Sequence, residues 1–336
     1  MARPHAGQNG SNALTVTAKH SGPATTTRRS TSRKLAITVL SGGPSNERAI
    51  SLASGAAVAD ALKSLGHDVF LEDVAPDNLG ALARAVDCVF IALHGTFGED
   101  GEVQSILEQR GLLYCGSGPE SCAVAMDKAA AKTRFIESNL PTPRFTIATP
   151  VTLETAIADW RSPVVVKPVK EGSSLSCTIV RDDARIRPAV EHLLERYPSC
   201  LIEEFIPGRE ITVGILGDTG LPPIEIRTPR EFYDYAAKYE DNQTEYRLDI
   251  DLPPAFLEDL VAMSVRAHQA LGCRDFSRVD WRVNDETLEP YLLEVNVIPG
   301  LTAHSLLPKA AAKAGLSMPM LGQRIVDLAL GRARSK

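Results

Sequence analysis

The stretch "SRVDWRVNDETLEPYLLEVNVIPGLTAHSLLP" (residues 277–308) determines the fold expected for the last part of the chain. Two apolar runs flank "NDET" (residues 284–287), a sequence typical of a hairpin turn, and so predict two antiparallel strands. Successive side chains of a strand point to opposite faces, so Glu294 and Asn296 share a face. A turn centred near Thr287 places Asp280 opposite Glu294 on the neighbouring strand. These three side chains are therefore expected to lie together.

Two interpretations of the trio Asp280, Glu294 and Asn296 follow from its chemistry. Three oxygen donors without sulfur or imidazole favour a hard cation such as Mg²⁺, which takes few carboxylates and leaves coordination sites for substrate phosphates. The alternative is a solvated face of a two-sided sheet, because charged side chains usually lie outside. The pattern alone leaves both interpretations open.

The first third of the chain alternates strand-like and helix-like segments. This alternation predicts a parallel sheet, whose ligands gather beyond the carboxyl ends of the strands. Glu47 and His94 both lie just past such ends. Alternatively, Glu47 caps the following helix and His94 is a loop histidine with internal partners. The expected strands cover residues 34–43, 67–74 and 86–95, and the expected helices cover residues 47–66 and 101–111.

The middle of the chain contains a glycine-rich turn next to a strand lysine. The segment "PVVVKPVKEGSSLSCTIV" (residues 163–180) carries Lys167 and then Gly172, Ser173 and Ser174 between two apolar runs. Glycine lets backbone N–H groups approach an anion, and the hydroxyls and the lysine add donors, so this segment resembles a phosphate lid. An ordinary turn is the alternative. Neither the Walker A pattern nor the G-x-G-x-x-G dinucleotide pattern occurs in the sequence.

Two further segments frame this turn. "MDKAAAKTRFIESNLPTP" (residues 126–143) predicts a helix that ends at Pro141, and "CLIEEFIPGREITVGIL" (residues 200–216) predicts two strands joined through Pro207-Gly208. Glu203 and Glu210 on these strands are either exposed strand residues or acceptors for the amino group and the ribose hydroxyls of a nucleotide.

A polar connection between Thr228 and Leu252 contains four of the seven tyrosines of the chain. A long connection of this kind is often a functional lid. Lys238 and Tyr239 stand out in it, because a lid that closes on phosphate needs a cation. The alternative is an aromatic patch that packs on its own helix.

Composition restricts the functional class. The 336 residues, 44% of them hydrophobic, are enough for two or three domains. Residues 1–34 hold six Lys/Arg and no acid, which leaves 30 basic and 42 acidic residues, a charge of −12, on the remainder. A folded part with this much negative charge is expected to bind nucleic acid poorly. The six cysteines have no zinc-like or C-x-x-C spacing, and no apolar run is long enough for a membrane span, so we expect reduced thiols and a cytoplasmic protein.

The first 34 residues are rich in Ser, Thr, Gly and basic residues and hold few apolar ones. Such a segment buries too little surface to offset its ordering entropy, so we expect a disordered basic tail. Its composition also suits an organellar transit peptide.

Taken together, these segments resemble one family, the D-alanine–D-alanine ligases of the ATP-grasp superfamily. The resemblance covers about Leu35 to Leu330 and rests on eight motifs in collinear order. These motifs are "SGGPSNERAISLASG", "ALHGTFGEDG", "YCGSGPESCAVAMDK", "VVVKPVKEGSS", "LIEEFIPGREITV", "EFYDYAAKY", "SRVDW" and "LEVNVIPGLTAHSLLP".

The resemblance implies an α/β (α+β) ATP-grasp fold with three domains. Residues 35–127 would form an N-terminal parallel α/β substrate domain, and residues 128–218 a small central α+β subdomain. Residues 219–336 would form a C-terminal α+β subdomain with a mainly antiparallel sheet, and ATP would lie between the last two. A homodimer is also implied.

The resemblance assigns roles to the residues that match the family motifs. Two Mg²⁺ ions, or Mn²⁺, would bind to Asp280, Glu294 and Asn296. The residues implied at ATP are Lys128, Lys167 and Ser174 at the phosphates, Glu203 at the adenine and Glu210 at the ribose. The residues implied at the two D-alanines are Glu47, Ser173, Tyr239 and His94 for the first and Lys238 and Ser305 for the second, with Arg278 and the N–H of Gly300 at the reacting groups.

The activity implied by the resemblance is the ATP-dependent joining of two D-alanines through an acyl phosphate, for peptidoglycan precursor synthesis. The alternatives are an ATP-grasp ligase with another acceptor such as D-lactate, and a non-catalytic nucleotide-binding relative. In this family a tyrosine-bearing lid goes with D-alanine as the acceptor, which favours the dipeptide. The sequence departs from the family at two places, with Leu175-Ser176 where Val-Gly is common and Val297 where Thr is common.

Overall fold

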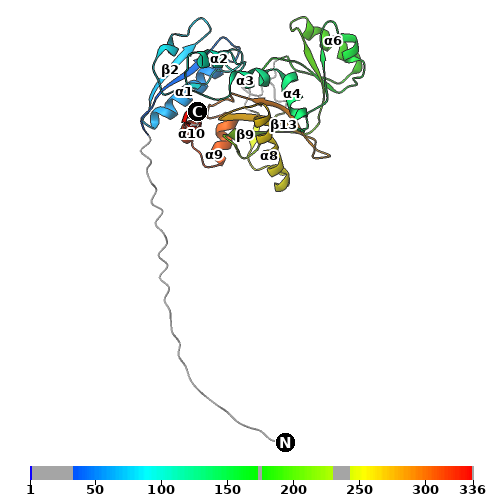
Figure 1. The fold of residues 1–336 in the computed structure, drawn as a ribbon. Helices are drawn as coiled ribbons and strands as arrows, with labels where there is room; N and C mark the ends of the chain where they lie inside the picture. The colour runs from blue at the N-terminus through cyan, green and yellow to red at the C-terminus, as the bar shows by residue number, and fades with distance from the viewer. Residues whose placement is uncertain (2–32, 173–175, 230–242, 335–336) are drawn as a thin grey trace. The chain divides into compact units, whose positions relative to one another are not determined.

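The structure is a computed structural model that describes residues 1, 33–172, 176–229 and 243–334. Contacts divide the chain into the units Met1–Arg33 and Lys34–Lys336, and the second unit carries all the helices and strands described below (Figure 1). Among the described helices, none combines the length and the apolar character needed to cross a lipid bilayer.

The first sheet is parallel and has the strand order β2-β1-β3-β4. Helix α1 packs on β1 and β2, and the C-terminal helix α10 packs against α1, β3 and β4. The alternation of apolar strands with helices therefore predicted this sheet correctly. Its elements are β1 (Ala36–Gly42), α1 (Arg48–Ser64), β2 (Asp68–Val74), the 3₁₀ helix η1 (Gly80–Ala83), β3 (Cys88–Ile91), α2 (Glu102–Gln109), β4 (Tyr114–Cys115) and α3 (Pro119–Met126).

The second sheet is antiparallel, has the order β5-β8-β6-β7 and encloses a small core of its own around Val166, Ile202 and Val190. The predicted strand with Lys167 is β6, and the apolar run after the glycine-rich turn is β7. The elements of this part are α4 (Lys128–Glu137), β5 (Phe145–Ala148), α5 (Leu153–Ile157), β6 (Val164–Pro168), β7 (Thr178–Val180), α6 (Asp183–Leu194) and β8 (Cys200–Glu204).

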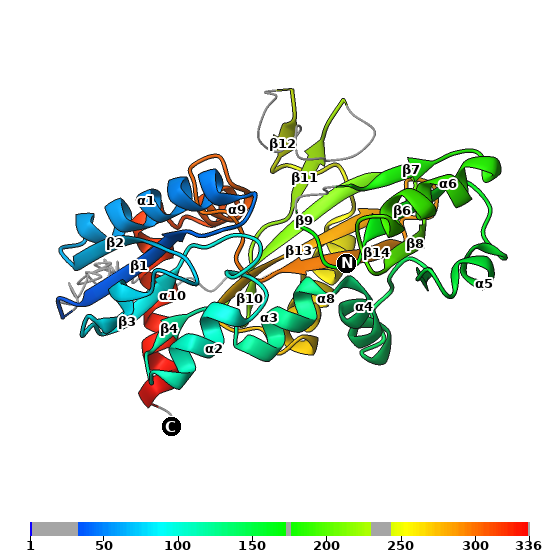
Figure 2. The ribbon, with the colours of Figure 1, turned by 90° about the horizontal axis from the view of Figure 1, so that it is seen from above.

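The third sheet has six strands, antiparallel at every pair, in the order β12-β11-β9-β13-β14 with β10 beside β9. Figure 2 shows it between the parallel sheet and the β5–β8 sheet, with α8 beneath β9 and β13. Its elements are β9 (Arg209–Leu216), β10 (Thr219–Gly220), β11 (Ile224–Arg227), β12 (Glu245–Arg247), α8 (Pro254–Ala270), β13 (Phe276–Val283), β14 (Pro290–Asn296), α9 (Leu306–Lys313) and α10 (Met318–Arg334).

The mixed α/β architecture with one parallel sheet and two antiparallel sheets confirms the predicted fold class. The two strands predicted around Pro207-Gly208 are present as β8 and β9. They belong to different sheets, so the chain crosses from the second sheet to the third at this point. The three-domain division remains a prediction, with β9 lying in the sheet of β13.

One helix boundary differs from the prediction. Helix α4 ends at Glu137 and not at Pro141. Asn139 adopts a left-handed backbone (φ 53°), and the N–H of Leu140 donates to the carbonyl of Phe135, which closes the helix before the proline is reached.

The parallel sheet and the six-stranded sheet share their apolar cores. Phe90 of β3 stacks on Phe276 of β13, and both belong to a cluster that includes residues of α1, α9 and α10. The carboxylate of Asp275 accepts a hydrogen bond from the N–H of Gly116 (2.8 Å) and pairs with Arg332 of α10. The first and third sheets are thus held as one body, which fixes the loops of the first sheet relative to β13 and β14.

Candidate active site

Strands β13 and β14 bring the predicted oxygen donors together. Asp280 pairs with Glu294 across the ladder, and Arg278 pairs with Asn296, so the predicted register is confirmed. The amide of Asn296 donates from Nδ2 to Oδ2 of Asp280 (2.8 Å), so this bond uses the nitrogen of the amide and not its carbonyl oxygen, which is an acceptor and can bind a cation. The geometry that the turn sequence predicted is therefore present.

Asp280 is nearly buried and is surrounded by donors. Arg278 Nε and Nη2 contact its two oxygens at 2.9 and 2.8 Å, and Thr212 Oγ1 donates to Oδ1 at 2.6 Å. Such a two-point contact fixes the plane of the carboxylate as well as its position. The arrangement differs from the solvated sheet face that was the alternative interpretation, because Asp280 is only 7% exposed.

Lys128, the first residue of α4, faces the same strands. Its Nζ lies 3.8 Å from Glu294 Oε2 and donates to the carbonyl of Glu171. Asp127 caps this helix by accepting the N–H of Ala130 (3.0 Å). A small cavity lies between these elements, and Glu99, Lys128, Glu171, Gly172, Glu294 and Asn296 are among the residues that line it.

Glu47 lies in an adjoining hollow of about 210 Å³. It is the N-cap residue of α1, yet its side chain accepts no cap hydrogen bond from the described first turn, so capping does not explain its position. A Cβ atom built on Gly95 or Gly172 would lie 3.0 or 3.1 Å from Glu47 Oε2. Glycines at these positions thus let two loops approach the carboxylate closely, and Met126, Glu171 and Gly172 line both this hollow and the cavity at Lys128.

His94 has internal partners for both ring nitrogens. Nδ1 lies 3.0 Å from the carbonyl of Ile298, and Nε2 lies 3.0 Å from Ser54 Oγ, which also accepts the N–H of Leu301 (3.2 Å). Burial lowers the pKa of His94 against the opposing effect of Glu47, so the ring is held neutral. This agrees with the loop-histidine alternative, and the contacts tie the loop after β14 to the first sheet.

The same loop brings Gly300 next to Ser305. A Cβ on Gly300 would lie 2.7 Å from Ser305 Oγ, so a larger residue would displace that hydroxyl. Ser305 is the N-cap residue of α9, and its Oγ accepts the N–H of Thr302 (3.1 Å).

Three charged side chains meet on the buried side of β6 and β8. Glu203 Oε1 contacts Lys167 Nζ at 2.9 Å, and Glu203 Oε2 contacts Lys132 Nζ at 2.7 Å. Burial alone would raise the pKa of Glu203, but the two lysines outweigh it and lower that pKa. The carboxylate is therefore charged in the folded protein.

Comparison with known proteins decides the family. The family model described as "D-ala D-ala ligase C-terminus" matches residues 142–327, and the one described as "D-ala D-ala ligase N-terminus" matches residues 71–117. The chain belongs to the D-alanine–D-alanine ligase family. The D-alanine–D-alanine ligase of Gloeobacter violaceus is 43% identical to it over 300 residues, which are 88% of this chain and 99% of the relative.

Two solved structures of ligases resemble the fold closely. The D-alanine–D-alanine ligase of Bacillus anthracis complexed with ATP matches with a TM-score of 0.77 and 30% identity, over 90% of this chain and 99% of that one. The VanG D-Ala:D-Ser ligase of Enterococcus faecalis matches with a TM-score of 0.79 and 26% identity, over 88% of this chain and 100% of that one.

Four residues that the ligase resemblance singled out, Ser173, Ser174, Lys238 and Tyr239, lie outside the described residues. Glu210 is described and lies on β9, where Arg282 Nη1 of β13 approaches its carboxylate at 3.6 Å.

Two charged residues of this ligase fold were not singled out from the sequence. Glu99 lies in the cavity with Lys128 and accepts the N–H of Gly95 (2.8 Å). Burial and the nearby Glu47 raise the pKa of Glu99 to about 8. Lys132 is the second, and the i, i+4 spacing of Lys128 and Lys132 was the signal that could have placed both lysines on one face of α4.

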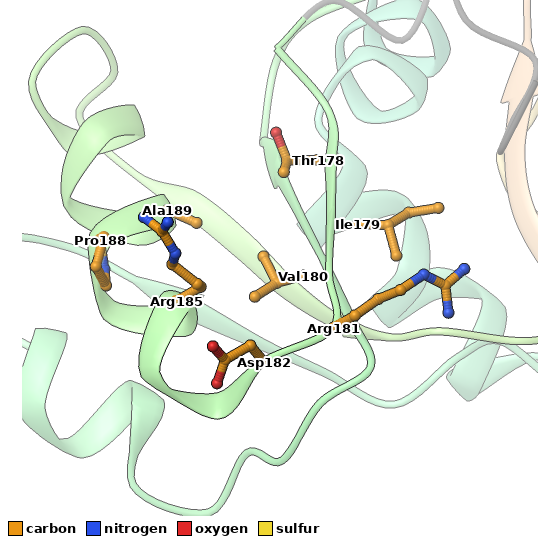
Figure 3. Close-up of a pocket in the computed structure, with 8 residues that line it drawn as sticks. All are labelled: Thr178, Ile179, Val180, Arg181, Asp182, Arg185, Pro188 and Ala189. Atoms are coloured by element: carbon orange, nitrogen blue, oxygen red, sulfur yellow. The ribbon is translucent and has the colours of Figure 1, made fainter.

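Another hollow lies on a different part of the protein. It measures about 460 Å³ and lies on the second sheet beside α6. Figure 3 shows that Arg181 points away from Arg185 there, so the two cations do not converge on a common ligand. We therefore do not assign this hollow to the ligase site.

Proposed function

We propose that the protein is an ATP-dependent ligase that joins two D-alanines into D-alanyl-D-alanine. Membership of the family and the use of ATP and D-alanine by that family support this conclusion. The single observation that carries it is the convergence of Asp280, Glu294 and Asn296 on one strand pair, next to Lys128. A non-catalytic relative would be expected to have lost part of this set.

The nucleotide lies, in this proposal, between the second and third sheets. Lys128, Lys167 and Ser174 bind its phosphates, Glu203 the adenine and Glu210 the ribose. The charge on Glu203 supports this placement, because this carboxylate stands beside Lys167, one of the residues proposed to bind the phosphates.

The same strands suit divalent cations. No group of three or more His, Cys, Asp or Glu side chains with metal-site geometry occurs among the described residues, and the proposed set has two carboxylates and one amide. Carboxylate and amide oxygens with no softer ligand fit Mg²⁺ or Mn²⁺. We propose that Asp280, Glu294 and Asn296 hold two such ions, which when bound neutralise charge on the ATP phosphates.

The first D-alanine binds, in this proposal, in the hollow at Glu47. The carboxylate of Glu47 receives its ammonium group, and Ser173 and Tyr239 complete the polar surroundings. Lys238 and Ser305 receive the carboxylate of the second D-alanine. His94 lies near the first substrate and acts through its hold on the Ile298 loop, since both of its nitrogens are engaged.

The reaction has two steps. The carboxylate of the first D-alanine attacks the γ-phosphorus of ATP, which forms an acyl phosphate and releases ADP. The amine of the second D-alanine then attacks the acyl carbon, loses a proton and expels phosphate. Arg278 and the N–H of Gly300 stabilise the negative charge that develops on the oxygens, and each such donor contributes about 3 kcal/mol in comparable sites.

The identity of the second substrate, which accepts the acyl group, is a more specific part of the proposal. We choose D-alanine because the curated relatives bear that name and the sequence contains Tyr239 in a lid-like connection. The likeness to a D-Ala:D-Ser ligase shows that this fold also occurs with another acceptor.

The test is purified protein with Mg-ATP and D-alanine, assayed together for phosphate and D-alanyl-D-alanine. Chelation with EDTA should abolish both products, and added Mg²⁺ or Mn²⁺ should restore them. Competition between D-alanine and D-lactate or D-serine at neutral pH should give mainly the D-alanyl dipeptide. Phosphate release without any dipeptide, or preferential formation of the D-lactate ester, contradicts the proposal.

We also propose a homodimer that supplies peptidoglycan precursors in the cytoplasm. The six cysteines are all free thiols, which suits a reducing compartment. Light scattering coupled to size-exclusion chromatography tests the dimer, and a monomeric mass contradicts it.

A further inference from the structure

Lys132 is the most completely buried cation of the site. Its side chain is 0% exposed, whereas that of Lys167, the other partner of Glu203, is 12% exposed. Lys132 Nζ donates to Thr142 Oγ1 (2.6 Å) and lies 3.5 Å from the carbonyl of Pro143. Thr142 in turn donates to the carbonyl of Leu292 on β14 (2.7 Å). These contacts hold the ammonium group of Lys132 in place from two sides.

Glu203 has one cation on each oxygen, and the two cations differ in their freedom. Lys167 stands on β6 and its side chain is 12% exposed, so its ammonium group can exchange Glu203 for a phosphate. Lys132 projects from α4 into the interior and has no path to a nucleotide phosphate through solvent. A carboxylate that is 3% exposed needs a partner at all times, because water cannot replace a lost cation there.

We infer that Lys132 is a positioning residue for ATP: it is the fixed counter-ion of Glu203 at neutral pH and thereby lets Lys167 leave that carboxylate to bind phosphate. The inference rests on the proposed nucleotide site and adds a residue to it. Without Lys132, Glu203 would retain Lys167 as its one remaining partner among these three side chains. Nucleotide binding would then have to break the last ion pair of a buried carboxylate.

The test measures ADP affinity by calorimetry for the full-length wild type, Lys132→Met, Glu203→Gln and the double variant. Binding of ADP to Lys132→Met has to break the last ion pair of Glu203, so we expect this variant to bind ADP at least about tenfold more weakly. Neutralising Glu203 frees Lys167, so the double variant should bind ADP at least about threefold more tightly than Lys132→Met does. Additive losses, or an unchanged affinity in Lys132→Met, overturn the inference.

Thr142→Val is the matched control. It removes a hydrogen bond of Lys132 and disturbs the same packing but keeps the charge, so ADP affinity should stay within about threefold of wild type. A loss as large as that of Lys132→Met would mean that packing and not charge matters, and would overturn the inference. In steady-state assays Lys132→Met should raise the KM for ATP while the KM for D-alanine at saturating ATP stays unchanged.

The two proposals fail in different ways. If the wild type binds no ADP and forms no dipeptide, the proposed function fails. If the wild type does both and Lys132→Met matches it in ADP affinity, only the role of Lys132 fails.

Discussion

Arg278 contacts both carboxylate oxygens of Asp280, its neighbour two residues along β13, at 2.9 and 2.8 Å. Residues i and i+2 of a strand lie on one face, so this pair forms without any bend of the backbone. The side chain of Arg278 is 13% exposed and borders the site. An arginine placed in this way can turn to another anion while its backbone stays fixed in the centre of the sheet.

Replacing Arg278 should affect the rate far more than the fold. In Arg278→Ala, Asp280 keeps its contacts with Thr212 and Asn296, so we expect the folded state to persist. The variant loses contacts that strengthen in the transition state, and kcat should fall by about two orders of magnitude or more. Steady-state dipeptide formation and far-UV circular dichroism measure the two effects. Arg209→Ala, which removes an exposed pair with Asp285, is the control and should retain its rate. A near-native kcat for Arg278→Ala would remove Arg278 from the mechanism.

The parts of the site that depend on local sequence rules were predictable, and those that depend on long-range packing were not. Asp280 opposite Glu294 followed from two local rules, the alternation of strand side chains and the position of a hairpin turn. Lys132 did not follow, because a lysine in "KAAAK" has the pattern of a solvent-exposed helix position. It is buried by the packing of β8 and of the Thr142–Pro143 segment against α4, which no local pattern encodes.

The burial of Glu99, a loop residue, was likewise not predictable from a local pattern. Its carboxylate folds back onto the N–H of Gly95 in a turn where Phe97 is buried with φ 73°. A left-handed backbone is unusual for a bulky residue and arises only where the surrounding structure imposes it. The sequence therefore showed that Glu99 is an acidic residue in a loop, but it did not predict that Glu99 is buried next to Glu47.

His268 should make the protein sensitive to acid. Burial lowers the pKa of His268, which contacts Ser277 Oγ at 2.7 Å, to about 4, with Asp218 acting in the opposite direction. Between pH 6.5 and 4 the unfolded chain binds a proton that the folded protein does not, so the free energy of unfolding falls as the pH falls. This group should contribute a loss of about 3 kcal/mol across that window. Urea denaturation between pH 7 and 4 measures it, and His268→Gln, which cannot titrate, should show a shallower decline. Identical slopes for the two proteins contradict the assignment.

Lys132 should change how the stability of the protein depends on pH in the alkaline range. Burial lowers the pKa of Lys132 to about 8, against the opposing effect of Glu203. From about pH 8 to the ordinary lysine value, the unfolded chain holds a proton that the folded protein has released. Stability should therefore rise with pH relative to a chain without this lysine. The difference in the free energy of unfolding between wild type and Lys132→Met should grow by about 2 kcal/mol from pH 7.5 to 9.5 in urea titrations. A constant or shrinking difference would show that Lys132 is charged across this range.

Ser176 has an unusual backbone conformation. This residue, which stands where the sequence resemblance leads us to expect glycine, adopts φ 57°, in the left-handed region, and its Oγ lies 3.4 Å from the hydroxyl of Tyr197. A left-handed conformation costs a residue with a Cβ about 1–2 kcal/mol, whereas glycine pays about 0.5–1 kcal/mol in lost chain freedom.

Because these two costs nearly cancel, Ser176→Gly should leave the free energy of unfolding within about 1 kcal/mol of wild type. Ser176→Val should lower the free energy of unfolding by about 1–2 kcal/mol relative to wild type, since a branched side chain crowds the left-handed backbone most. Urea denaturation of both variants gives the comparison. Ser199→Val, at a position outside the left-handed region, is the matched control and should show less than half of that loss. Equal stabilities for Ser176→Gly and Ser176→Val would mean that residue 176 leaves the left-handed region in solution.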